Sequence, residues 1–274
     1  MSRVAFLLVL ALASAVVGWV WLRPATHEEQ QASNGAGAAP PPAAATAPAA
    51  PTAPPPPPSP AEEEPYTYAP ASSGGIGKFF HKREIAQVMG HPAIGWLERD
   101  NREDEEAPSK ALAAIDLKPT DVIADIGAGS GYYSFRISPK VPQGKVVAVD
   151  IQQEMLDFLI KKSAELKITN VEPHLGAIDD LKLPAASIDA ALMVDAYHEF
   201  SHPREMLASL QKALKPGGRI FLLEFRGEDP NVPIKPLHKM TEAQARLEFE
   251  GAGFKFVSNM RPLPWQHLMV FQRP

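Results

Sequence analysis

The chain has 274 residues, 45% of them hydrophobic, which is enough for a well-packed globular domain. Its net charge of −5 excludes the basic surface that recruits nucleic acid, so we predict no nucleic-acid partner. Because the chain has no cysteine, disulfides, thiolate nucleophiles and cysteine metal sites are excluded. We predict no metal site.

The N-terminal part carries a long apolar segment. Val4 to Leu22 is a run of 19 residues without a charge. At about 1.5 Å per residue, a helix of this length nearly spans the ~30 Å hydrocarbon core of a bilayer. We predict a single-pass membrane anchor within residues 1–23, with the side of the membrane undecided. A cleaved signal sequence is the alternative, because Ala13-Ser14-Ala15 fits a small-residue cleavage site.

Two segments separate this run from the predicted α/β domain at residues 108–274. Fourteen of the 29 prolines lie between Pro24 and Pro70, and such Ala/Pro-rich composition predicts a disordered, semi-rigid spacer over 24–70. Residues 71–107 are expected to cap the domain, with a short helix at Glu84 to Met89.

A glycine-rich turn is the most informative motif. Val122 to Ala124 is typical of a buried parallel strand, and Asp125-Ile126-Gly127-Ala128-Gly129-Ser130-Gly131 follows. Glycines let the backbone turn tightly and approach a ligand closely. A dinucleotide-binding turn would need Gly or Ala at position 132, which is tyrosine here.

A second strand, Lys145 to Asp150, ends in an acid. A carboxylate in this position, one βα unit after the glycine turn, can accept both ribose hydroxyls of a nucleoside. Capping of the next helix is the alternative role for Asp150.

The turn and its spacing resemble motif I of the class I methyltransferases that use S-adenosyl-L-methionine (SAM), especially the small-molecule and quinone-type domains. Gly176 to Pro184 is similar to the third-strand region of that family, although the adenine-binding acid would fall at Ala177. Asp179 or a backbone N–H could replace it. The resemblance implies SAM as cofactor and the following contact residues: Asp125, Gly127, Ala128, Gly129, Ser130, Gly131, Asp150, Ile151, Ala177, Ile178, Asp179 and Asp195.

The same resemblance implies an α/β, Rossmann-like fold with a seven-stranded, mostly parallel sheet in the order 3-2-1-4-5-7-6. Its last strand is antiparallel. Apolar residues at helical spacing predict an amphipathic helix from Gln152 to Lys167, with Met155, Leu156, Leu159 and Ile160 on one face. The final two strands, 254–258 and 267–272, are expected to pair.

Candidate catalytic residues follow the predicted fourth strand, Ala190 to Asp195, at the edge where open parallel sheets bind ligands. His198 is the first candidate for a general base, because imidazole titrates near neutrality. Tyr197 and Glu199 are alternates. Candidate substrate residues are His81, Trp96, His238, Trp265 and His267.

We expect a SAM-dependent methyltransferase acting on a small molecule, with no stable protein partner. A membrane-tethered, catalytically silent ligand-binding module is the alternative function. An NAD-dependent enzyme is a more distant one.

Overall fold

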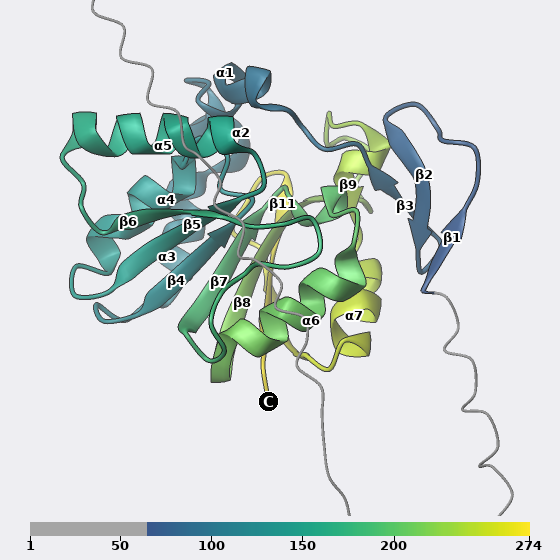
Figure 1. Cartoon of the computed structure of the whole chain (residues 1–274). Helices are drawn as coiled ribbons and strands as arrows, with labels where there is room; N and C mark the ends of the chain where they lie inside the picture. Colours follow the sequence, from purple (N-terminus) through teal and green to yellow (C-terminus); the bar gives the residue numbers. More distant parts are fainter. Residues whose placement is uncertain (1–64) are drawn as a thin grey trace, which may run out of the picture. The chain divides into compact units, whose positions relative to one another are not determined.

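The computed structural model describes residues 65–274 (Figure 1). The predicted anchor and nearly all of the Ala/Pro-rich spacer lie outside this range. Between residues 65 and 274, no helix is both long enough and apolar enough to cross a bilayer.

A mixed sheet forms the centre of the described part, with strands in the order β10-β11-β8-β7-β4-β5-β6. β4 to β8 run parallel to one another, whereas β11 is antiparallel to both of its neighbours. This confirms the predicted order and the pairing of the last two strands. The strands are β4 Val122–Ile126, β5 Lys145–Asp150, β6 Val171–Leu175, β7 Ile188–Val194, β8 Leu214–Arg226, β10 Lys255–Met260 and β11 Gln266–Gln272, and the short β9 Lys239–Met240 pairs with β8.

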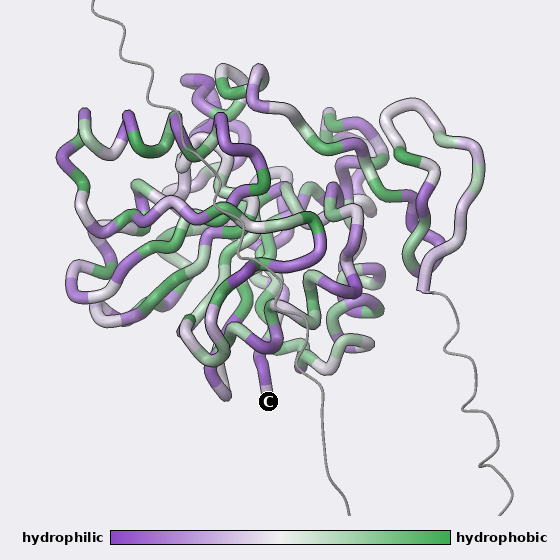
Figure 2. Tube along the Cα trace, viewed as in Figure 1, coloured by the Kyte–Doolittle hydropathy of each residue, from purple (hydrophilic) through white to green (hydrophobic). Residues whose placement is uncertain are grey.

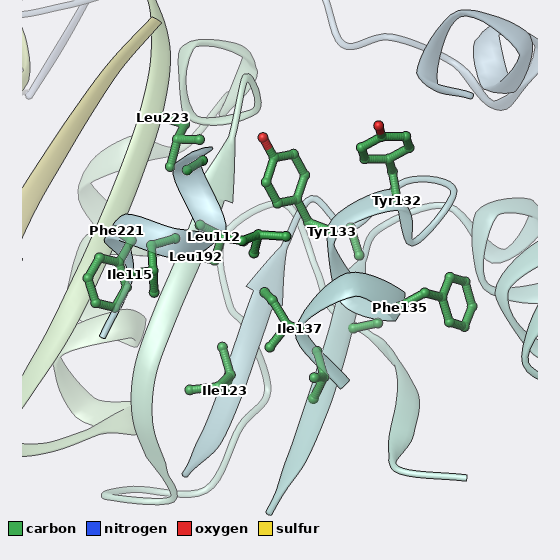
Figure 3. Close-up of a cluster of buried hydrophobic side chains, with 14 of the residues drawn as sticks. Leu112, Ile115, Ile123, Tyr132, Tyr133, Phe135, Ile137, Leu192, Phe221 and Leu223 are labelled. Carbon is green, nitrogen blue, oxygen red and sulfur yellow. The ribbon is translucent and has the colours of Figure 1, made fainter. Parts of the chain in front are cut away.

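Helices cover both faces of the sheet, as buried parallel strands require. One cluster of buried side chains joins α3, α4 and α5 to the sheet, and Figure 3 shows Leu112, Tyr133 and Ile137 from that layer against Ile123 and Leu192. A second cluster joins α6 and α7 to the opposite face. The helices are α3 Pro108–Ala114, α4 Tyr132–Ile137, α5 Gln153–Leu166, α6 Pro203–Ala213 and α7 Glu242–Gly251.

Local sequence accounts for the helix ends. Pro203 occupies the first position of α6, where its missing N–H costs nothing. Thr241 caps α7 by accepting the Gln244 N–H at 3.1 Å. In α5, Met155, Leu156 and Leu159 are buried as predicted, but Ile160 is 55% exposed. The buried stripe of α5 is thus narrower than expected, and hydrophobic and hydrophilic residues alternate along this helix in Figure 2.

The edge strand β6 has an unusual centre. The Val146 N–H donates to Asn170 O, and the Gly176 N–H donates to Asp150 O. Main-chain groups of the even-numbered residues of β6 therefore face β5, and those of Pro173 face away from the sheet. Proline is tolerated there because its missing N–H belongs to no ladder.

A separate three-stranded sheet precedes the catalytic domain, formed by β1 Tyr66–Tyr68, β2 Gly75–Phe80 and β3 Arg83–Ala86. The predicted helix at Glu84 to Met89 is therefore wrong. The β2–β3 turn is made by His81 and Lys82, both with positive φ, 47° and 69°. β1 also begins inside the range assigned to the spacer, so the folded part starts before residue 70.

Residues 87–107, called the cap segment below, connect the small sheet to α3. The cap segment contains α1 Ile94–Leu97 and α2 Arg102–Glu106, preceded by the 3-10 turn η1 His91–Ala93. Further 3-10 turns lie at η2 Ser138–Lys140, η3 Tyr197–Glu199 and η4 Pro236–His238.

Candidate active site

The glycine loop follows β4 and adopts a backbone that favours glycine. Gly127, Gly129 and Gly131 have φ of 72°, 53° and 75°. A Cβ on Gly127 would lie 2.7 Å from the Ala196 Cβ, and one on Gly129 would lie 2.8 Å from Leu97 Cδ1. The loop is therefore packed closely on both sides, and only glycine fits it without displacement.

Asp150 at the end of β5 is tied to this loop. Its Oδ2 accepts the Gly129 N–H at 2.9 Å, and its Oδ1 accepts the Gln152 N–H at 2.9 Å. Asp150 therefore does not cap α5, whose N-cap is Gln152 without a side-chain cap, and its carboxylate retains acceptor sites for further donors. Burial raises its pKa, and these backbone donors partly offset that effect.

Exposed apolar side chains follow β5 and β6 at the same edge of the sheet. Ile151 is 41% exposed and Ile178 is 51% exposed. An aromatic base could pack on such side chains. The Ala177 N–H donates to Asp180 O at 2.8 Å, so it is not available to read adenine. Asp179 is exposed and remains the candidate acid of this region.

The cap segment covers the glycine loop. The Ser130 hydroxyl donates to Glu98 Oε1 at 2.5 Å, and the other oxygen of Glu98 pairs with Lys162 on α5 at 2.5 Å. Leu97 lies directly against Gly129. The predicted substrate residue Trp96 is half exposed on α1, and Arg99 stacks on its ring at 3.8 Å. The open hollow lined by Glu228, Glu242 and Arg246 belongs to α7, away from this loop.

Asp125, at the C-terminal end of β4, is buried with 3% exposure. The Ser134 hydroxyl donates to its Oδ2 at 2.6 Å. Burial raises the pKa of Asp125 to about 6, because a charged carboxylate loses its hydration there.

Five buried side-chain polar atoms find no hydrogen-bond partner within residues 65–274, and three of them are Asp195 Oδ1, Gln266 Oε1 and the Tyr133 hydroxyl. Gln266 Nε2 donates to the other oxygen of Asp195 at 2.6 Å. Asp195 also has a φ of 49°, which is strained for a residue with a side chain. Burial raises the pKa of Asp195 well above its ordinary value. Unpaired buried groups on a strained backbone are typical of a ligand site.

His198 lies on η3, just after β7, and is almost fully buried. Its Nδ1 is 2.6 Å from Glu224 Oε2, and its Nε2 is 3.0 Å from Nδ1 of His238 on η4. Glu199 Oε1 lies 3.8 Å from His198 Nε2 and 3.5 Å from His238 Nδ1. Burial alone would lower the pKa of His198, but the charge and hydrogen bond of Glu224 outweigh it and raise that pKa.

Residues 123–218 match the family described as "Methyltransferase domain". The chain is 31% identical over 115 residues to a demethylmenaquinone methyltransferase of Deinococcus radiodurans, which covers 42% of this chain and 47% of that protein. It is 31% identical over 129 residues to a ubiquinone/menaquinone biosynthesis C-methyltransferase of Syntrophotalea carbinolica, and this match covers 46% of this chain and 51% of that protein. The matches thus span about half the length of these curated relatives.

A solved structure extends the likeness. A SAM-dependent methyltransferase from Aquifex aeolicus superposes with a TM-score of 0.65 at 25% identity, over 68% of this chain and all of that one. The chain carries a class I SAM-dependent methyltransferase domain. This confirms the predicted family, and the family's cofactor is SAM.

The residues of this methyltransferase domain fit SAM. The glycine loop leaves no room for a Cβ at Gly127 or Gly129, so its backbone amides can approach a ligand. Asp150 is fixed beside that loop with acceptor capacity for a ribose, and Asp195 Oδ1 still lacks a donor.

Arg83 stabilises the loop that carries His198. Its guanidinium pairs with Glu248 at 2.7 Å and 2.9 Å and donates to the His198 carbonyl at 3.2 Å. The Tyr197 hydroxyl donates to the same carboxylate at 2.7 Å. β3 of the small sheet is thereby joined to both η3 and α7 of the methyltransferase domain.

Several predicted site residues lie elsewhere. Tyr197 is fully buried in the cluster on the α6–α7 face, which argues against its alternate catalytic role. His81 forms the exposed β2–β3 turn. His267 contacts Asn259 at 2.8 Å and Glu228 at 2.9 Å, so its imidazole is engaged away from His198. Trp265 is half-buried on the loop before β11.

The structure adds residues that the sequence analysis missed. Gln266 precedes His267 on β11, and alternation along the strand turns its side chain toward Asp195 instead. Glu224 lies near the end of β8, and its position as an acid at a strand end is the sequence feature that could have identified it. Tyr133 followed the glycine turn without any distinguishing pattern. No metal site was predicted, yet His198, Glu199 and His238 form a group that could hold an ion.

Proposed function

We propose that this chain transfers the methyl group of SAM to a small-molecule acceptor. The observation that carries the proposal is the glycine loop with Asp150 hydrogen-bonded to Gly129 at its centre. When bound, SAM supplies an electrophilic methyl group on a sulfonium sulfur. The residues of the chain then position the reactants and exclude water, which is the main protein contribution to such a displacement. Leu97 and Glu98 of the cap segment help to exclude water from the glycine loop.

A small, polar acceptor is supported by two observations. Asp195, Gln266 and Tyr133 offer buried polar atoms that lack partners, and these suit a ligand with hydroxyl or similar groups. Two of the relatives are quinone methyltransferases by name, and quinols carry such hydroxyls.

The part played by His198 as a general base stays a prediction, with Glu199 as the alternate. Both follow β7 at the carboxyl edge of the sheet. Many methyl transfers need no base, because proximity alone supplies much of the rate.

Calorimetry with SAM tests the cofactor. Asp150→Ala should weaken SAM binding by about 1.5–3 kcal/mol, the scale of hydrogen bonds to a charged group. The exposed Asp157 on α5, replaced by alanine, is the matched control and should leave SAM affinity unchanged. Binding of NAD in preference to SAM would favour the dehydrogenase alternative. SAM binding without turnover on any acceptor would favour the silent module.

We also propose that Val4 to Leu22 anchors the enzyme to a membrane as a single-pass segment. Its uncharged length supports this proposal. The side on which the catalytic domain lies is left open.

A further inference from the structure

Three potential metal ligands converge beside the strand ends of β7 and β8. They are His198 Nε2, His238 Nδ1 and Glu199 Oε1, contributed by η3 and η4. The side chain of His198 is 2% exposed and that of Glu199 is 10% exposed, whereas His238 is 24% exposed. The group therefore has a buried base and one side open to solvent.

The spacing of these atoms suits a common ion. Two ligand atoms about 2.1 Å from a Zn²⁺ ion at the tetrahedral angle lie about 3.4 Å apart. The observed separations are 3.0 Å, 3.5 Å and 3.8 Å. A single position near the middle of the three atoms would thus serve all of them with small side-chain adjustments.

Glu224 orients His198 for this role. Its Oε2 lies 2.6 Å from His198 Nδ1, and an ionised carboxylate there keeps the ring proton on Nδ1. The lone pair of the neutral imidazole is then on Nε2, facing His238 and Glu199. A carboxylate behind a histidine is the usual support of a histidine metal ligand.

Charge also favours a cation. Glu224 pairs with His198, and Glu199 pairs with His198 and His238. The backbone N–H groups of His198 and Met89 also donate to Glu224 and Glu199, at 3.3 Å and 3.0 Å. Arg83 donates to the His198 backbone, but its guanidinium is bidentate on Glu248. With neutral imidazoles, two carboxylate charges would remain in a largely buried site with hydrogen bonds but no positive charge of their own, and a cation would supply that charge.

We propose that His198, His238 and Glu199 bind one divalent transition-metal ion, with Zn²⁺ as the simplest case, and that Glu224 positions His198. Two imidazole nitrogens favour ions of this class over Mg²⁺ or Ca²⁺. Three protein ligands leave at least one coordination position open for water or for a substrate oxygen, and while the ion is bound His198 Nε2 has no free lone pair, so His198 then acts as a ligand and not as the general base. The use of the open position by a substrate rests on the proposed methyl transfer, whereas the binding of the ion does not.

The test is a titration of the chelator-treated full chain with Co²⁺, followed by its visible absorption, and then displacement of Co²⁺ by Zn²⁺. We expect one ion per chain and no comparable competition from Mg²⁺. His238→Ala and Glu199→Gln should each weaken Co²⁺ binding by at least about tenfold, and Glu224→Gln by about 10- to 100-fold. His91→Ala, which removes an exposed imidazole outside the group, should retain the wild-type affinity.

Several results would overturn the proposal. These are the absence of a Co²⁺ spectrum in the wild type, equal affinity in Glu199→Gln and wild type, or equal loss in His91→Ala. Thermal melting of each variant separates loss of a ligand from loss of the fold, and the isosteric Glu199→Gln variant suffices if His238→Ala is unstable. Because the readout is the metal itself, a failure to bind SAM would refute the proposed function without affecting this result.

Discussion

The buried carboxyl of Asp125 makes the stability of the protein depend on pH. Its pKa of about 6 in the folded chain exceeds the ordinary value of 3.8, so the folded state holds the proton more tightly. This stabilising contribution is fully present below about pH 4 and is lost as the pH rises through 6.

Asp125→Asn removes this titration. The stability of the wild type relative to the variant should fall by roughly 3 kcal/mol between pH 4 and pH 8, since one pKa unit is about 1.4 kcal/mol. Urea unfolding at several pH values measures the difference. A constant difference across this range would contradict the prediction.

Asp180→Asn is the control with the opposite sign. Hydrogen bonds from Ser209 and from the Lys182 backbone lower the pKa of Asp180, so its contribution is present above the unfolded pKa and lost as the pH falls. The wild type should therefore gain stability over this variant with rising pH.

The positions of single residues were predictable where backbone chemistry is distinctive. The alternating glycines and Asp150 are such cases, because left-handed turns and strand-end acids leave local traces in the sequence. His267 and Gln266 show where this fails. Shifting by one residue along a strand changes the face of the sheet, and no local pattern marked which of the two meets the site. His198 and His238 are 40 positions apart in the sequence, so no local pattern indicated their contact either.

The cap segment lies against the glycine loop. Glu98 joins α1 to Ser130 and Lys162, while Leu97 lies against Gly129. We predict that a ligand reaching this loop requires the cap segment to move, and that the contacts of Glu98 oppose this movement.

Glu98→Ala should loosen the cap. Loss of about 1 kcal/mol from these partly exposed contacts corresponds to roughly fivefold faster release of SAM, measured by stopped-flow. Glu165→Ala, which breaks an exposed pair with Lys161 on α5, is the control and should leave the release rate unchanged. Equal release rates in Glu98→Ala and wild type would mean that the cap is not the barrier.

At the level of elements, the central sheet and its helices were predicted because buried strands and amphipathic helices alternate clearly along residues 108–274. The small sheet was not. Hairpins are usually signalled by Asn-Gly or Asp-Gly, whereas His81 and Lys82 form this turn. The contacts that hold β3, notably Arg83 with Glu248, are long-range and supply the stability that the turn residues lack.

The start of the folded part can be located by deletion. Removing residues 1–64 should leave the fold intact and, if Val4 to Leu22 is the anchor, release the enzyme from membranes on fractionation. Removing residues 1–70 also deletes β1, whose Tyr66 packs on Phe80 and donates to Glu205.

The longer deletion should cost roughly 3 kcal/mol, the scale of losing a buried aromatic side chain, and lower the melting temperature by roughly 10 °C. Melting curves of the two shortened proteins give the comparison. Identical melting temperatures would show that β1 adds nothing to the fold.

Pro173 has a consequence for how separate molecules meet. A strand of another chain that paired with the free edge of β6 would need backbone N–H donors from residues 171, 173 and 175. Pro173 has no backbone N–H, so the central hydrogen bond of that pairing cannot form. The open side of the sheet is therefore a poor template for strand addition, so copies of this chain that meet at high concentration should not associate through that edge.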